Sequence, residues 1–114
     1  MVRIMPRKMM PKKMGVLKKL MVQVKFVLTE PRWTIVKIIG KEEKSTNEIY
    51  NELKSRGFEI PRSTLYYYLS SLQDVGIIEL AGYKEVGGGA PEKVWRLKVT
   101  RIGIDLLSGE IVIE

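Results

Sequence analysis

The chain has 114 residues, with 20 Lys and Arg against 13 Asp and Glu, and therefore a formal net charge of +7. It contains no His and no Cys. These absences exclude disulfides, thiol redox chemistry, zinc fingers and any catalytic triad built on either residue. We expect one cytoplasmic domain with a modest core, and no membrane span, because no stretch approaches the ~20 apolar residues that a spanning helix needs.

The positive charge is concentrated in the N-terminal quarter. Residues 1–29 contain eight basic residues and no acidic one, so the rest of the chain is almost neutral. Residues 1–13 include two prolines and show no apolar periodicity, and we interpret them as a flexible basic arm that contacts DNA phosphates. A solvated tail is the alternative, and several early Met residues leave the translation start open. The basic residues of the arm are Arg3, Arg7, Lys8, Lys12 and Lys13.

Residues 14–29 are predicted to form an amphipathic helix. Apolar side chains recur there at i, i+4, i+7 and i+11, which is the spacing of one helical face. We expect this stripe to pack, either on its own domain or on a second subunit. We favour dimerisation through the helix, with the C-terminal tail as the other element that could form the dimer. The stripe consists of Leu17, Met21, Val24 and Leu28.

Three helices are predicted next, within residues 31–40, 45–57 and 61–75. The second begins with a capping box, in which Ser45 and Glu48 each satisfy the free backbone N–H of the other. The third has three consecutive tyrosines and a leucine stripe at helical spacing. Along that helix the core side is formed by Leu65, Leu69 and Leu72, Tyr68 is expected to be structural, and Tyr67 is expected to be exposed.

Two strands are predicted after the helices, within residues 76–80 and 93–99, joined by a Gly-rich loop. This loop is not a phosphate-cradling loop, because Lys93 is followed by a strand rather than by Ser or Thr and a helix. Residues 100–107 are predicted as a last short helix capped by Thr100, and residues 108–114 as a C-terminal tail or short strand.

The order of these elements is that of an α+β winged helix-turn-helix, a three-helix core plus a β-hairpin wing, with an added N-terminal amphipathic helix. The local residues resemble the PadR-like and related ArsR and MarR winged-helix regulators, which share a third helix of the type Thr-Leu-Tyr-x-x-Leu-x-x-Leu-x-x-x-Gly-Ile-Ile. A Gly-rich wing and an aromatic-Arg-Leu-x-x-Thr-x-x-Gly segment entering a C-terminal helix follow in that family. The resemblance covers residues 30–107. The matching positions are Thr64, Leu65, Tyr66, Leu69, Leu72, Gly76, Ile77, Ile78, Gly87 to Gly89, Trp95, Arg96, Leu97, Thr100 and Gly103.

The resemblance implies a sequence-specific transcriptional regulator that binds double-stranded DNA as a homodimer. Its third helix, 61–75, would lie in the major groove, with the wing along the backbone. The candidate recognition residues are Arg62, Ser63, Thr64, Tyr66, Tyr67 and Ser70. The candidate wing residues are Lys84, Lys93 and Arg96. The chain departs from the resemblance in lacking a long C-terminal dimerisation helix, and the Cys and His with which ArsR relatives sense metals; no metal and no cofactor are expected.

Other functions remain open at this stage. The face of Ser and Tyr side chains on helix 61–75 is also compatible with an ordinary polar surface, and residues 45–75 contain three basic and four acidic residues. The alternatives are a winged-helix interaction module of the transcription machinery and a chromatin-type DNA-binding protein of low specificity. An enzyme is not expected, because the acidic residues are scattered and no spacing points to a shared catalytic site.

Overall fold

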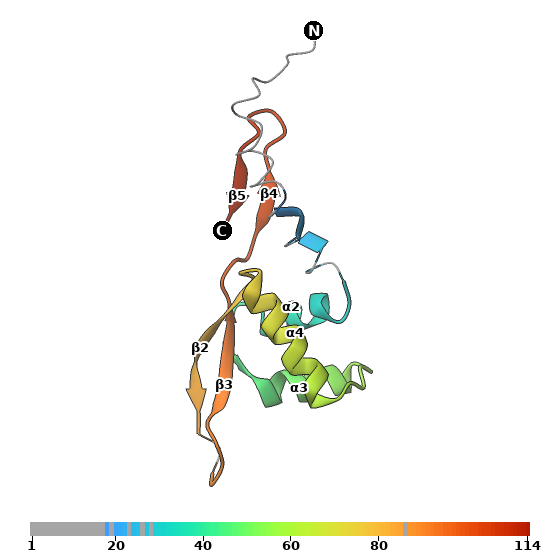
Figure 1. Cartoon of the computed structure of the whole chain (residues 1–114), viewed down its shortest axis with the longest axis vertical. Coiled ribbons are helices and arrows are strands. Elements are labelled where there is room, and N and C mark those ends of the chain that lie inside the picture. The colour runs from blue at the N-terminus through green and yellow to red at the C-terminus, as the bar shows by residue number, and fades with distance from the viewer. Residues whose placement is uncertain (1–17, 19, 23, 26, 28, 86) are drawn as a thin grey trace.

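The α+β winged helix-turn-helix expected from the sequence is confirmed, with two β-hairpins after the helices (Figure 1). The computed structural model describes residues 18, 20–22, 24–25, 27, 29–85 and 87–114. The described residues between 18 and 27 are helical. The elements that follow are α2 (Arg32–Ile39), β1 (Lys44–Ser45), α3 (Thr46–Ser55), α4 (Arg62–Asp74), β2 (Ile78–Lys84), β3 (Glu92–Leu97), β4 (Ile102–Ile104) and β5 (Ile111–Ile113).

Both ends of α2 are set by local chemistry. The Glu30 carboxylate accepts hydrogen bonds from the Thr34 backbone N–H at 3.3 Å and from the Thr34 hydroxyl at 2.6 Å, which satisfies a backbone donor of the first turn. Gly40 follows the helix with φ of 55°, in the left-handed region that glycine adopts at little cost.

The predicted capping box at the start of α3 is confirmed. The Ser45 hydroxyl accepts from the Glu48 N–H at 3.2 Å, and the Glu48 carboxylate accepts from the Ser45 N–H at 3.3 Å. Hydrogen bonds from Ser45 to the Glu48 carboxylate favour its charged form and lower its pKa, and the positive charge of Lys84 lowers this pKa further. The α3 N-terminus is therefore stabilised by a negative charge.

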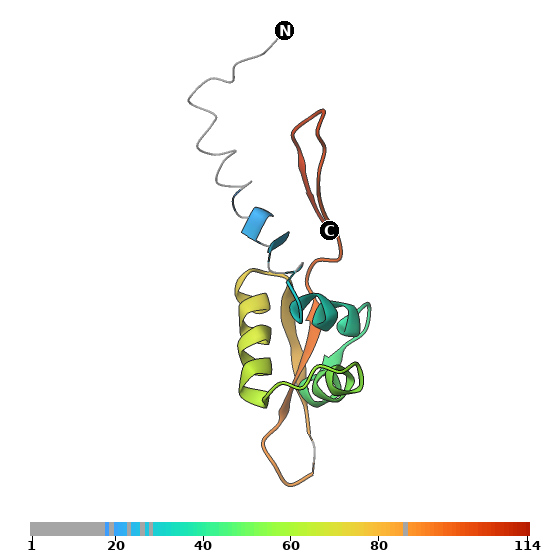
Figure 2. The same cartoon turned by 90° about the vertical axis from the view of Figure 1, so that its right-hand side faces the viewer.

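The sheet of the winged helix has the strand order β1–β3–β2, with antiparallel pairing throughout. Its β2–β3 hairpin runs along the helices, and its tip extends beyond them (Figure 2). Trp95 faces the helices from the middle strand, opposite Leu80 on one side and Lys44 on the other. Side chains from all three helices complete the core. It consists of Ile35, Ile38, Ile39, Ile49, Leu53, Leu65, Leu69, Leu72, Ile77, Ile78 and Trp95.

The prediction of a short helix capped by Thr100 over residues 100–107 is wrong. This segment instead forms β4 and the turn into β5, the strand that does lie within residues 108–114. The alternation of Ile102 and Ile104 about Gly103 has the period of a strand. The Asp105 carboxylate then accepts hydrogen bonds from the N–H groups of Leu107 and Ser108 at 2.9 and 3.1 Å, which forms a turn in place of a helix.

The two ends of the described chain contain exposed apolar groups. On the N-terminal helical segment Met21 and Val24 are exposed and Leu20 is buried, whereas Leu17 and Leu28 of the predicted stripe lie outside the described residues. The β4–β5 hairpin extends away from the helices (Figure 1). Among the residues described, no helix is long and apolar enough to cross a membrane.

Candidate nucleic-acid interface

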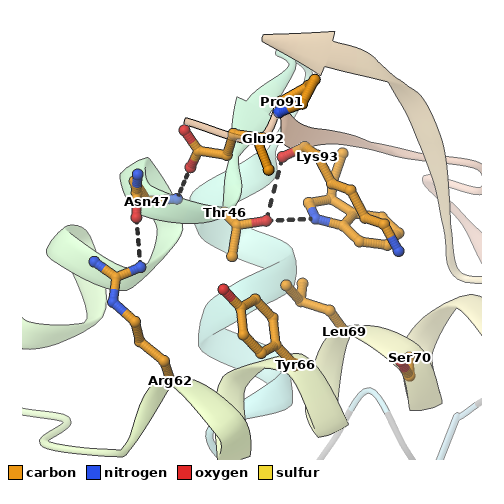
Figure 3. Close-up of a pocket in the computed structure, with 11 residues that line it drawn as sticks. Thr46, Asn47, Arg62, Tyr66, Leu69, Ser70, Pro91, Glu92 and Lys93 are labelled. Atoms are coloured by element: carbon orange, nitrogen blue, oxygen red, sulfur yellow. Dashed lines mark hydrogen bonds between the residues drawn. The ribbon is translucent and has the colours of Figure 1, made fainter. Parts of the chain in front are cut away.

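A hollow of about 670 Å³ lies between α4 and the wing (Figure 3). Three of the predicted recognition residues, Arg62, Tyr66 and Ser70, line it from α4. Asn47 lines it from the first turn of α3, and Lys93 from the wing strand β3. The structure thus brings together α4 and wing residues that are about 30 positions apart in the sequence.

A buried threonine that lines this hollow connects the wing to α3 by hydrogen bonds. The Thr46 hydroxyl donates to the Lys93 carbonyl oxygen at 3.2 Å and accepts from the Trp95 indole N–H at 3.0 Å. The Thr46 hydroxyl and the Trp95 indole N–H are therefore both hydrogen-bonded away from water, as buried polar groups need to be. The wing strand is held in one position relative to the helices.

A second chain of hydrogen bonds runs from the wing through α3 to α4 (Figure 3). The Glu92 carboxylate accepts from the backbone N–H of Asn47, and the Asn47 side-chain oxygen accepts from the Arg62 guanidinium. The Arg62 guanidinium also lies 4.4 Å from the centre of the Tyr50 ring, in a cation–π contact. These contacts fix the position of the Arg62 guanidinium at the start of α4. Further N–H donors remain on it, because a guanidinium has five.

The three tyrosines of α4 have different surroundings, as the sequence predicted. Tyr68 is partly buried and packs against the core, whereas Tyr67 is exposed. Tyr66 is exposed and faces the hollow. Arg32 of α2 lies on the other side of α4, 4.7 Å from the Tyr68 ring centre and 5.8 Å from that of Tyr67, and it donates to the Ser71 hydroxyl. A second guanidinium therefore borders the exposed face of α4.

The two helices of the helix-turn-helix have opposite electrostatics at their N-termini. The α3 N-terminus is occupied by the carboxylates of Glu48 and Glu92. The first turn of α4 contains no acidic residue and makes no side-chain cap hydrogen bond. Because a helix N-terminus carries a partial positive charge, the start of α4, with Arg62, favours an anion more than the start of α3 does.

The three predicted wing residues lie in different places. Lys93 lines the hollow, with its ammonium 5.9 Å from the Trp95 ring centre. Lys84 lies 3.8 Å from Glu48 in an exposed ion pair. Arg96 pairs with Glu79 at 2.8 Å, which raises the Arg96 pKa, and the alternation of β3 puts it on the opposite face from Trp95. Arg96 is therefore separated from the hollow.

The remaining predicted residues are distributed as follows. Ser63 is exposed and Thr64 half-buried at the start of α4. The basic arm, Arg3, Arg7, Lys8, Lys12 and Lys13, lies outside the described residues.

Sequence reasoning missed Thr46, Asn47 and Glu92. A signal for the first two was present, because they directly follow the capping-box serine at the start of α3. Glu92 had no such signal, since only the fold brings it to α3.

Comparison with known proteins assigns the chain to a family. Residues 23–88, more than half of the chain, match the ferric uptake regulator family. The chain belongs to the ferric uptake regulator family. A comparison with curated protein sequences gave no match.

Solved structures resemble this family member over most of its length. HlyU from Vibrio cholerae N16961 is 20% identical, with a TM-score of 0.54 over 71% of this chain and 76% of that one. The GAS PerR–Zn–Zn structure is 19% identical, with a TM-score of 0.51 over 89% and 64%. The ferric uptake regulator of Vibrio cholerae is 26% identical, with a TM-score of 0.48 over 76% and 67%. The first two show that the fold is shared.

The resemblance noted in the sequence is confirmed at the level of a winged-helix regulator, and the family shown is that of the ferric uptake regulators. Its name implies a metal. Imidazole and thiolate ligands are absent from the chain, which has no His and no Cys, and the described residues contain no group of three or more Asp and Glu placed to hold a metal ion. The residues present therefore do not fit such a metal, and we assign no function to one.

Proposed function

We propose that this protein is a sequence-specific transcriptional regulator that binds double-stranded DNA, with α4 in the major groove and the wing along the backbone. The observation that carries this proposal is the placement of Arg62 by Asn47 and Glu92, beside the wing and at the uncapped start of α4. Recognition helices of this fold class read base edges with their N-terminal residues. The family is one of regulators, in agreement with a non-enzymatic role in the cytoplasm.

The residues around the hollow would make different kinds of contact with DNA. Arg62 can form a bidentate hydrogen bond with guanine through its remaining donors, and Ser63 and Ser70 can bond to base edges or phosphates. Lys93 supplies a phosphate contact from the wing. The pairing of Lys84 with Glu48 and of Arg96 with Glu79 makes these two residues weaker contributors than Lys93.

Most nonspecific affinity would come from the basic arm. Release of counterions by Lys and Arg at phosphates gives binding that falls steeply with salt. Arg3, Arg7, Lys8, Lys12 and Lys13 form the densest run of positive charge in the sequence. Removal of residues 1–13 should therefore reduce the salt dependence of binding more than it reduces discrimination between sequences.

A homodimer completes the proposal, because a single α4 reads only a few base pairs and twofold proteins read paired half-sites. On the N-terminal helical segment, Met21 is 68% exposed and Val24 is 36% exposed. Exposed apolar side chains at helical spacing suit an interface with a second copy. The apolar stripe predicted from the sequence also includes Leu17 and Leu28.

The test is fluorescence anisotropy with a duplex that the full chain has selected from a random pool. Loss of a bidentate base contact costs about 1–3 kcal/mol, so Arg62→Ala should weaken binding to the selected duplex about fivefold or more. Lys93→Ala should weaken binding to all duplexes alike. Arg56→Ala is the control, since Arg56 lies at the far end of α3, paired with Glu52. Equal losses in Arg62→Ala and Arg56→Ala would contradict the assignment of α4.

A further inference from the structure

A second cavity lies at the end of the helices opposite the wing tip, where the N-terminal helical segment, α2 and the start of β4 meet (Figure 1 and Figure 2). Its volume is about 390 Å³, within the range of roughly 300–1,000 Å³ that is typical of small-ligand pockets. None of its described lining residues also lines the hollow between α4 and the wing. The proposed DNA interface therefore gives this cavity no role.

The described walls of this cavity are mostly apolar. Val24 and Val27 line it from the N-terminal helical segment, and Trp33 and Val36 line it from α2. Ile77, in the link between α4 and β2, lines it as well. Trp33 remains 36% exposed, and burial of so large a ring strongly favours binding of an apolar group. These walls fit the apolar part of a ligand.

The charged groups at this cavity favour an anion. Arg101 lines the cavity, and one nitrogen of its guanidinium pairs with the Glu114 carboxylate at 2.7 Å. A guanidinium has five N–H donors in a planar fork that matches a carboxylate, so Arg101 has donors for a second one. The Lys37 ammonium, 5.6 Å from the Trp33 ring centre, adds a positive charge beside the same wall. The Thr100 hydroxyl, by contrast, already donates to the Glu114 main-chain carbonyl at 3.3 Å.

We propose that this cavity binds an apolar monocarboxylate, with its tail against Trp33 and the valines and its carboxylate on Arg101. At the ~30 Å³ that a water molecule occupies in the liquid, the cavity has room for roughly ten non-hydrogen atoms. This is the size of octanoate, a carboxylate with an unbranched apolar tail. The inference goes beyond the proposed DNA binding and does not depend on it.

The cavity is connected to several elements of the winged helix. The Ile77 N–H donates to the Leu72 carbonyl in the last turn of α4 at 2.9 Å, and the Ile77 carbonyl accepts from the Lys98 N–H after β3 at 2.9 Å. Of the described residues on the proposed dimer surface, Val24 lines the cavity and Met21 does not. A ligand in the cavity would therefore contact the N-terminal helical segment, α2 and the link after α4, and would leave Met21 uncovered.

The experiment is a titration of the full chain with octanoate, followed by tryptophan fluorescence without DNA. The chain has two tryptophans, and Trp95 is only 4% exposed. Octanoate should shift the emission of Trp33 to shorter wavelength in a saturable way, because the ligand displaces water from its ring. Trp33→Phe should abolish this shift while the emission of Trp95 remains, which places the ligand at the cavity.

Two further probes separate the charge of the ligand from its tail. 1-Octanol has the tail without the carboxylate and should bind roughly tenfold or more weakly than octanoate, because hydrogen bonds between charged groups are the stronger ones. Acetate has the carboxylate without the tail and should give no saturable shift in the same concentration range. Equal affinities for octanoate and 1-octanol would overturn the assignment of a carboxylate.

Arg101→Gln tests the polar end of the cavity. It should weaken octanoate binding roughly tenfold or more and leave 1-octanol binding unchanged, since 1-octanol has no charge for Arg101 to pair with. A variant that had lost its fold would lose both ligands. Arg56→Gln is the matched control, because Arg56 also pairs with a glutamate in an exposed ion pair, at the far end of α3.

Three results would overturn the proposal. They are the absence of a saturable shift with octanoate, an equal loss of octanoate affinity in Arg101→Gln and Arg56→Gln, and a loss of 1-octanol affinity in Arg101→Gln as large as that of octanoate. DNA is absent from every titration. A failure of this site therefore leaves the proposed DNA binding untouched, and a failure of DNA binding leaves this site untouched.

Discussion

The winged helix and the β4–β5 hairpin bury their apolar residues very differently. In the winged helix, Leu65 and Leu72 are fully buried, and the polar Thr46 has two hydrogen-bond partners. In the hairpin, Leu107 is 100% exposed. The first region buries its apolar side chains within one chain, whereas the second leaves Ile104, Leu107 and Ile113 exposed. The difference separates residues that stabilise the fold from residues that contribute little to its stability.

The largest expected effect is the difference in stability between replacing a leucine of the winged helix and replacing a leucine of the hairpin. Leu65→Ala should lower the free energy of unfolding by about 3 kcal/mol, because it leaves a cavity in a packed core. Leu107→Ala should change it by less than about 0.5 kcal/mol, because surface substitutions seldom do more. Urea unfolding followed by circular dichroism measures both. A loss of stability in Leu107→Ala comparable to that in Leu65→Ala would show that the hairpin is part of the core.

The sequence could predict those features of the structure that depend on residues close together in the chain. The capping box and the leucine stripe of α4 were predictable because each depends on residues within one or two helical turns. Residues 100–107 were misassigned as a helix because the apolar pattern there is short, and the turn depends on the Asp105 side chain. The contact of Glu92 with Asn47 was not predictable, because it joins residues 45 positions apart.

The next effect concerns the α3 N-terminus. Ser45→Ala should lower the free energy of unfolding by about 1 kcal/mol, as loss of a serine N-cap does. Because the capping box lowers the pKa of Glu48 in the folded protein, its contribution is present above the ordinary glutamate pKa and is lost as the pH falls through the folded pKa. Unfolding at neutral and acidic pH should show the difference between wild type and variant shrinking with acid. A difference that does not change with pH would contradict this role of Glu48.

A smaller effect is expected on DNA affinity at Glu92. Glu92→Gln keeps an acceptor for the Asn47 N–H and removes a negative charge from the interface, so affinity should rise several-fold. Glu110→Gln, in the hairpin, removes the same charge far from the hollow and is the matched control. Anisotropy titrations at one salt concentration compare them. An equal rise in both variants would mean that net charge, and not the position of Glu92, is responsible.

The smallest effect is expected at Arg96. Its ion pair with Glu79 is about half-exposed, and exposed pairs contribute about 0–1 kcal/mol. Arg96→Ala should therefore leave stability nearly unchanged. It should also weaken DNA binding less than Lys93→Ala does, because only Lys93 lines the hollow. A larger loss of affinity for Arg96→Ala would place the DNA on the opposite face of the wing.

The central claim is that the winged helix selects DNA by sequence. The most direct measurement is the ratio of affinities for the duplex selected from a random pool and for a scrambled duplex of the same composition, at one stated salt concentration. The account predicts a ratio of roughly a thousand or more, as for specific regulators. A ratio near one, or a pool in which no sequence is enriched, would contradict it.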